Sequence, residues 1–356
     1  MKNVATKRSI TLLALLCVVF AAAAPMCAET LNADYAIEQV QKYYSDNGIQ
    51  PTSAEEIIVF SSVNALGGKT LPDIWDEQQD DMTNYIGLVF CRLSRDTDPS
   101  EDYNGVNPVE YLAQQQNENG SFGTVEQTAL AAAALEAAQV RAGEDTIYYS
   151  ARAAVSWLID NQSQDGAYGD GARSTGMALS YLSKFNSGDN GDVRASVTAA
   201  QEYLSSCIEQ GGEFDIFDLS WVIMGLTDTG EDVNEAKWAG LGYALDNFKN
   251  SDGTYRAQSD GEDAFDSDAS MAAVAAFDAV LNSASWVSKL MNSSSYSVFV
   301  WDNLRPYLYV FAVICMLSLI FWGYIMFGRK KHHEPQSSRL FSDSSEDPGS
   351  GEEQSE

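Results

Sequence analysis

Two kinds of apolar segment alternate through most of the chain. In the first kind, apolar residues recur at the spacing of one helix face, i, i+3, i+4 and i+7, as in Ala151, Ala154, Val155 and Leu158. This spacing predicts amphipathic helices with one face in water. The second kind is apolar almost all round, as in the Ala-rich run 128–140, and predicts helices that other elements cover on every face.

The alternation follows an internal sequence repeat. One copy combines an aromatic–Leu pair, a Gln and a Gly-x-aromatic-Gly turn: Tyr111, Leu112, Gln116, Gly120, Phe122 and Gly123. The next copy repeats every one of these positions 46 residues later: Trp157, Leu158, Gln162, Gly166, Tyr168 and Gly169. A third copy has Tyr203, Leu204, Gly212 and Phe214 with Gln210 displaced, and a shorter fourth has Tyr243, Leu245, Gly253 and Tyr255.

Each copy predicts a helix, a tight turn and a second helix. The glycine permits a positive-φ helix stop, and we expect the aromatic ring to pack back against the helix just ended. Further apolar helices are expected at 217–226 and 269–281, and an upstream pair at 35–44 and 54–66. An apolar helix at 85–93 has a poorly defined partner near 71–80.

These six hairpins predict an all-α fold in two concentric layers, with amphipathic helices outside and apolar helices inside. Six pairs are enough to close a ring of the (α/α)6 type. An open solenoid is the alternative, because stacked helical hairpins also bury a continuous core without closing.

The N-terminus predicts a secretory signal peptide over 1–28. Lys2, Lys7 and Arg8 form a basic region before the apolar run 10–24, whose roughly fifteen residues are too short for a bilayer core of ~30 Å. Small residues follow, and we expect cleavage after Ala28. A lipoprotein anchor at Cys27 is the alternative reading.

Residues 306–328 predict one transmembrane helix at the other end. They carry no charged side chain, and at 1.5 Å rise per residue they cover about 34 Å. Three basic residues, 329–331, follow at once and indicate the cytoplasmic side. The chain is therefore expected to be a single-pass cell-membrane protein with an extracytoplasmic body at 29–285 and a short linker at 286–305. Its acidic, Ser-rich cytoplasmic tail, 329–356, is expected to be disordered.

Charge and residue usage exclude several functions for the body. Of the 51 acidic residues 44 lie between the signal and the membrane segment, against 14 of the 21 basic ones, so this part carries the net charge of −30. Such a body is not expected to bind nucleic acid. Both histidines, His332 and His333, lie in the tail, which leaves no imidazole for a Ser–His relay or a His-ligated zinc. Cys91 and Cys207 either pair or serve as small buried hydrophobes.

The two best repeat copies resemble the QW-type repeat of the squalene–hopene cyclase and prenyltransferase superfamily. The resemblance covers 108–281 and implies an (α/α)6 toroid. Cyclases of this family protonate an alkene or epoxide with an Asp-rich motif, which Asp266-Ser267-Asp268 matches only in part because Ala269 replaces its last Asp. Prenyltransferases use a zinc ion held by Asp, Cys and His, and the body has no His. The superfamily also includes intrinsic-factor-like cobalamin binders, so the resemblance is compatible with binding alone.

The candidate site lies where the inner helices begin, because their first turns would surround one end of a ring. Charged or aromatic candidates there are Glu126, Arg173, Asp215, Asp218, Trp221, Asp266 and Asp268. Asp218, Asp266 and Asp268 are the candidate acids and bases, although acidic residues at helix starts also cap free N–H groups. Asp260, Glu262 and Asp263 form a weaker candidate Ca²⁺ site that lacks the EF-hand spacing.

Three functions are compatible with this sequence. The first is a membrane-anchored toroid that binds an extracytoplasmic small molecule, glycan or protein without catalysis. The second is a cyclase-like or glycan-active enzyme that works through carboxylates such as Asp218 and Asp268. The third is a structural or adhesive component of the cell surface.

Overall fold

The computed structural model describes residues 32–65, 81–142, 149–186 and 190–293, together with 315, 316 and 318. Within these ranges the chain is all-α, with helices, turns and two isolated bridges but no strand. The signal peptide, the helix expected near 71–80, the tail and all but three residues of the predicted membrane helix lie outside them. The chain divides into two compact units, Met1–Tyr296 and Ser297–Glu356, and the packed helices belong to the first.

Both predicted kinds of helix are present. The apolar helices are α3 (Ala54–Ser62), α4 (Asp81–Ser94), α6 (Val125–Ala142), α8 (Ala172–Leu182), α10 (Ile216–Asp228) and α12 (Ser267–Asn282). The helices that precede them in the chain are α2 (Ala33–Asp46), α5 (Pro108–Gln114), α7 (Ala151–Asp160), α9 (Gly191–Glu209) and the one-turn α11 (Leu241–Ala244) with the 3₁₀ helix η3 (Leu245–Phe248). In α7 only Ala154, Val155 and Leu158 are buried, whereas α12 buries every residue over 269–279. For these two helices the hydrophobic periodicity therefore predicted correctly which has a single buried face and which is buried all round.

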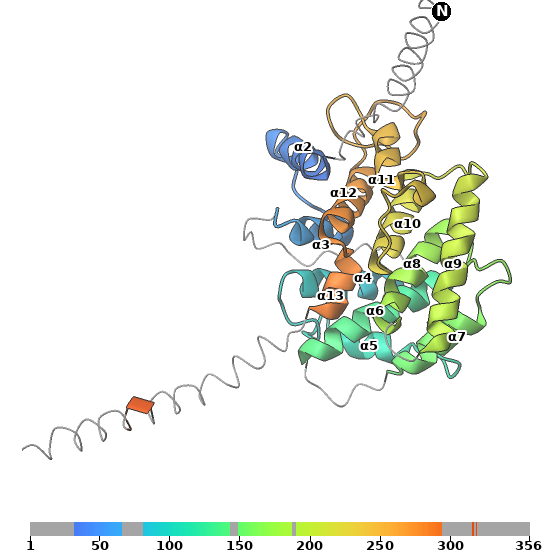
Figure 1. Ribbon diagram of the computed structural model, residues 1–356. Helices are drawn as coiled ribbons and strands as arrows, with labels where there is room; N and C mark the ends of the chain where they lie inside the picture. The colour runs from blue at the N-terminus through green and yellow to red at the C-terminus, as the bar shows by residue number, and fades with distance from the viewer. Residues whose placement is uncertain are drawn as a thin grey trace, which may run out of the picture. The chain divides into compact units, whose positions relative to one another are not determined.

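The apolar helices pack on one another in chain order. The helix α4 packs on α6, α6 on α8, α8 on α10 and α10 on α12, while α12 packs on α2 and α3, and α3 on α4. In Figure 1 the N-terminal α2 (blue) lies beside α12 (orange). The Phe265 ring, just before α12, lies 4.8 Å from the ring of Tyr43 and 5.6 Å from that of Tyr44. The first and last described hairpins are thus neighbours.

The helices α8 and α10 approach each other closely because glycines face each other across the contact. A Cβ atom on Gly176 would lie 2.3 Å from the backbone oxygen of Trp221. On the other side, a Cβ atom on Gly225 would lie 2.4 Å from the backbone oxygen of Gly176. Real Cβ contacts are never this short, so the separation of these two helices requires residues without side chains.

The repeated glutamine joins each turn to the next outer helix. The Gln162 amide donates to the backbone oxygens of Gly166 and Ser196, both at 2.9 Å, and accepts from the Ser196 hydroxyl at 2.7 Å. Gln116 does the same in the preceding copy, donating to Gly120 at 3.1 Å and to Ser150 at 3.0 Å and accepting from the Ser150 N–H at 2.9 Å. The repeat motif therefore encodes a hydrogen-bonded link between successive hairpins.

Three of the four repeated turn aromatics are buried, Phe122, Tyr168 and Tyr255, and Phe214 of the third copy is half-buried. The described contacts of Tyr168 and Tyr255 lead forward along the chain. Tyr168 is fully buried and bonds through its hydroxyl to Ser196 of α9, while the Tyr255 ring lies 5.9 Å from Phe277 of α12. In the third copy the positive φ falls at Gly211, one residue before the glycine expected from the repeat. This copy is also the one in which the glutamine is displaced.

The body extends past the boundary expected at residue 285. Residues 286–292, expected to be linker, form a short helix, α13 (Trp286–Asn292), that contacts α3, α4, α6, α8 and α12. Trp286 is buried, with its ring 5.0 Å from Phe90 and 6.1 Å from Trp221. The Asp228 carboxylate accepts from the N–H and hydroxyl of Ser285 at 2.7 and 2.6 Å. These contacts fix α13 against the apolar helices.

No single helix among the described residues is long and apolar enough to cross a membrane. The helices α12 and α13 are long and apolar enough only when taken together, and a bend of 56° separates them. Most of the α12 residues are buried within the body, as expected of a core helix. The predicted span at 306–328 stays a prediction, because it falls outside the described residues apart from 315, 316 and 318.

The two cysteines of the body lie on different helices. Cys91 is buried on α4, and Cys207 is half-buried on α9. No disulfide joins these two in the part of the chain that the structure describes. The prediction of a small buried side chain agrees with Cys91, whereas Cys207 is only half-buried.

Candidate functional site

Arg173 ties the first turns of α8 and α10 together. Its guanidinium donates to both carboxylate oxygens of Asp215 at 3.0 Å and to Asp218 at 3.0 Å, and it lies 5.3 Å above the ring of Phe217. Asp215 and Asp218 also form a capping box at the start of α10, in which each side chain accepts from the other's backbone N–H. Of the candidates named from the sequence, the structure thus brings these three together.

Glu55, which the sequence reading missed, joins this group from α3. Desolvation raises its pKa from 4.5 to about 7 although the side chain keeps an exposed surface, with repulsion from Asp268 adding to the effect and Arg173 opposing it. We call Glu55, Arg173, Asp215, Asp218 and Asp268 the rim cluster. It draws on the first turns of α3, α8, α10 and α12.

The raised pKa of Glu55 has a stability consequence. The folded chain holds this proton more tightly than the unfolded chain does, so the folded state loses stability as the pH rises from 4.5 to about 7. Above that range the cost stays constant. The side chain keeps an exposed surface, and screening by water limits the cost to about 1 kcal/mol.

Burial also raises the pKa of Asp268, with repulsion from Asp266 and Glu56 adding to it. Asp268 makes one described hydrogen bond, from the neighbouring Ser267 hydroxyl at 3.4 Å. Asp268 and Glu55 are thus two carboxylates of the cluster without a cationic side chain bound to them among the described contacts. Both side chains are exposed.

Two other candidates at the helix starts have structural partners. Asp266 accepts from the Ala269 N–H at 3.1 Å and caps α12. Burial raises the pKa of Glu126, but hydrogen bonds from the hydroxyls of Ser174 and Thr124 outweigh this and leave it lowered. Helix capping was the alternative considered from the sequence, and it accounts for Asp266. The hydrogen bond from Ser174 links Glu126 of α6 to α8.

Trp221 and the calcium candidates do not extend this site. The half-buried Trp221 ring contacts Trp286 of α13, which is a packing role. Hydrogen bonding by the Ser251 side chain and by its N–H, the latter at 3.0 Å, lowers the pKa of Asp263. Glu262 is exposed. Over the described ranges no group of three or more His, Cys, Asp or Glu residues could hold a metal ion. The predicted Ca²⁺ ligands therefore do not converge.

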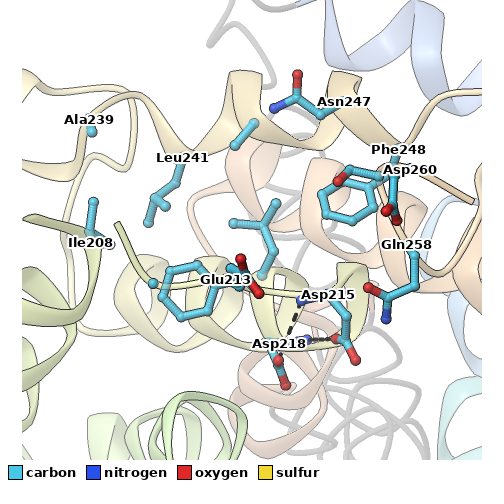
Figure 2. Close-up of a pocket in the computed structure, with 15 residues that line it drawn as sticks. Ile208, Glu213, Asp215, Asp218, Ala239, Leu241, Asn247, Phe248, Gln258 and Asp260 are labelled. Carbon is cyan, nitrogen blue, oxygen red and sulfur yellow. Dashed lines mark hydrogen bonds between the residues drawn. The ribbon is translucent and has the colours of Figure 1, made fainter. Parts of the chain in front are cut away.

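A cleft of about 930 Å³ opens beside the start of α10 (Figure 2). It lies between the end of α9, the first turn of α10, the α11–η3 segment and the loop 258–260. The residues that line it are Ile208, Gly212, Glu213, Phe214, Asp215, Asp218, Leu219, Ala239, Leu241, Ala244, Asn247, Phe248, Gln258, Ser259 and Asp260. Asp215 and Asp218 thus belong both to this cleft and to the rim cluster.

No known protein family, curated protein or solved structure matches this chain.

Proposed function

We propose that this chain is a membrane-anchored, extracytoplasmic protein whose body binds a ligand at the rim cluster without catalysis. The observation that carries the proposal is the meeting of charged first turns from helices far apart in the sequence. The Arg173 guanidinium donates hydrogen bonds to Asp215 and Asp218. The charges of Asp268 and Arg173 both affect the pKa of Glu55. The single cationic side chain of the cluster already holds two carboxylates, which leaves Glu55 and Asp268 for a ligand.

The fold we propose for the body is an (α/α)6 toroid like those of the cyclase and prenyltransferase superfamily. Support comes from the alternation of amphipathic and apolar helices and from the packing order that leads from α4 to α12 and on to α3. In such a ring the inner helices run parallel to one another, so their first turns share one end. The rim cluster agrees with that geometry.

The ligand that suits Glu55 and Asp268 is a small molecule rich in hydrogen-bond donors or carrying a positive charge. A carboxyl with a pKa of about 7 is present in both forms near neutral pH, so Glu55 can donate or accept. An unpaired carboxylate such as Asp268 favours a cation. The negative net charge of the body disfavours anionic ligands.

A second candidate function, an enzyme that uses two carboxylates, is favoured by one observation. Glu55 keeps a proton at a pH where an ordinary carboxylate has lost it, as a general acid requires. Asp218, proposed from the sequence as one of the pair, is held by Arg173. Glu55 and Asp268 are therefore the better pair for glycan chemistry.

Native mass spectrometry of the full chain, purified in detergent from its own host, tests the proposal. We expect a small molecule to co-purify with the wild-type chain and to be lost from Glu55→Gln/Asp268→Asn. The matched control, Glu38→Gln/Glu110→Gln, removes two exposed acids outside the cluster and should retain it. A ligand retained by the Glu55/Asp268 variant would refute binding at the rim cluster. Conversion of the released ligand by fresh wild-type protein would favour the enzyme instead.

A further inference from the structure

The cleft beside α10 has rigid walls. The Arg256 guanidinium donates to the backbone oxygens of Asn247 at 3.1 Å and Ser259 at 2.7 Å, which fastens the loop to η3. The same side chain donates to Gln258 at 3.1 Å. The Ile216 N–H at the start of α10 donates to Ala257 at 3.2 Å. Because these contacts exist without a ligand, binding here requires little ordering of the chain.

The polar lining of the cleft has one sign of charge. Four carboxylates line it, those of Glu213, Asp215, Asp218 and Asp260, and no basic side chain does. Arg173 neutralises part of the charge of Asp215 and Asp218 from behind. Glu213 and Asp260 are exposed and have no ion pair or hydrogen bond within the described part of the chain. In Figure 2 Glu213 lies in the middle of the cleft and Asp260 at one end.

The remaining lining is apolar and aromatic. Leu219, Leu241 and Phe248 form a buried floor, and Phe214 is half-buried. Figure 2 places Ile208 and Leu241 at the end opposite Gln258 and Asp260. The volume of about 930 Å³ is near the upper limit of ordinary small-molecule sites, so the cleft has room for an extended ligand. Such a ligand must present cationic groups and an apolar group together.

We propose that this cleft binds an extended basic peptide segment. Lys or Arg side chains of the segment pair with Glu213 and Asp260. An apolar side chain on the other side of Glu213 from Asp260 covers Leu241 and Phe214. Asn247 and Gln258 supply amide groups for the peptide backbone. A cleft lined by one sign of charge concentrates ligands of the opposite sign, and the acidic body extends this effect.

This second site shares Asp215 and Asp218 with the rim cluster. It makes no use of Glu55 and Asp268, the two carboxylates proposed to bind the ligand of that cluster.

Isothermal titration calorimetry with the full chain in an uncharged detergent tests this site. The probe is the end-blocked peptide Lys-Leu-Lys-Leu-Lys, and the comparison ligands are the same peptide with acetylated lysines and spermine. We expect Glu213→Gln/Asp260→Asn to weaken the affinity for the probe about tenfold, since it removes two partly exposed ion pairs. Glu118→Gln/Glu202→Gln removes two exposed acids away from the cleft and should leave the affinity unchanged.

Three outcomes would overturn the proposal. The first is an equal affinity in the Glu213/Asp260 variant and the wild type, or an equal loss in the Glu118/Glu202 control. The second is tight binding of the acetylated peptide, which would show that charge is not recognised. The third is spermine binding as tightly as the probe, which would remove the role of the apolar floor. Glu55→Gln/Asp268→Asn should keep full affinity for the probe, so this result does not depend on those two carboxylates.

Discussion

Replacing Gly176 with alanine is expected to lower the free energy of unfolding by about 2 kcal/mol. The added Cβ atom would lie 2.3 Å from the Trp221 backbone oxygen and 2.5 Å from its carbonyl carbon. Backbone atoms cannot rotate away, so α8 and α10 must separate, which costs about 3 kcal/mol. The higher helix propensity of alanine recovers about 1 kcal/mol of this. Chemical denaturation of the full chain in detergent, followed by circular dichroism, measures the difference.

Gly191→Ala is the matched control, because no atom lies within 4 Å of the added Cβ atom at the start of α9. Its stability should equal or slightly exceed that of the wild type. Gly225→Ala should behave like Gly176→Ala, since its Cβ atom would meet the Gly176 backbone. If Gly176→Ala and Gly191→Ala unfold at the same denaturant concentration, α8 and α10 do not pack as closely as described.

Replacing Gln162 with alanine is also expected to lower the free energy of unfolding by about 2 kcal/mol. The substitution removes one donated bond of 2.9 Å within the turn, to Gly166. It also removes two bonds to Ser196 of the next hairpin, one donated at 2.9 Å and one accepted at 2.7 Å. Each is worth about 1 kcal/mol, and partial exposure of the site lets water replace some of them. Chemical denaturation checks this, and Gln116→Ala should lose a similar amount because its three bonds have the same arrangement.

Gln114→Ala separates this effect from the general loss of a glutamine, since Gln114 is exposed at the end of α5. It should change stability by less than about 0.5 kcal/mol. Gln162→Glu should lose at least as much stability as Gln162→Ala, because one of its carboxylate oxygens would face the two backbone oxygens to which the amide donates. A Gln162→Ala chain as stable as Gln114→Ala would mean that the repeat motif does not join the hairpins.

Hydrophobic periodicity was sufficient to predict most of the helices. The segments expected at 35–44, 85–93, 128–140, 217–226 and 269–281 all lie within observed helices. The short α13 was missed because seven residues complete fewer than two turns and carry little periodic signal. Its burial depends on contacts with Phe90 and Trp221, which are distant in sequence.

The sequence predicted where the candidate site lies, but not which of its side chains bond to one another. The repeat indicated the first turns of the apolar helices, and Arg173, Asp215 and Asp218 do meet there. Which carboxylate caps a helix and which stays available depends on side-chain geometry. Glu55 was missed because the upstream hairpins depart from the repeat, although the capping box of Ser53 and Glu56 marks the same helix start.

The cleft could not be read from the repeat because it arises where the repeat is shortened. The outer helix of the last hairpin, α11, has 4 residues, against 10 in α7 and 19 in α9. Residues of α11, with η3 and the loop 258–260, line the cleft beside the end of α9. The sequence repeat is therefore weak in the segment that forms the cleft.

The proposed function requires that the charged first turns of α3, α8, α10 and α12 lie close together. A titration of the Glu55 carboxyl tests this most directly. Carbon-13 NMR of the full chain, labelled at glutamate carboxyls and assigned by comparison with Glu55→Gln, measures its pKa. Burial and the charge of Asp268 should raise this pKa to about 7 in the wild type, and Asp268→Asn should lower it. A wild-type pKa near the ordinary 4.5 that Asp268→Asn leaves unchanged would contradict the rim cluster.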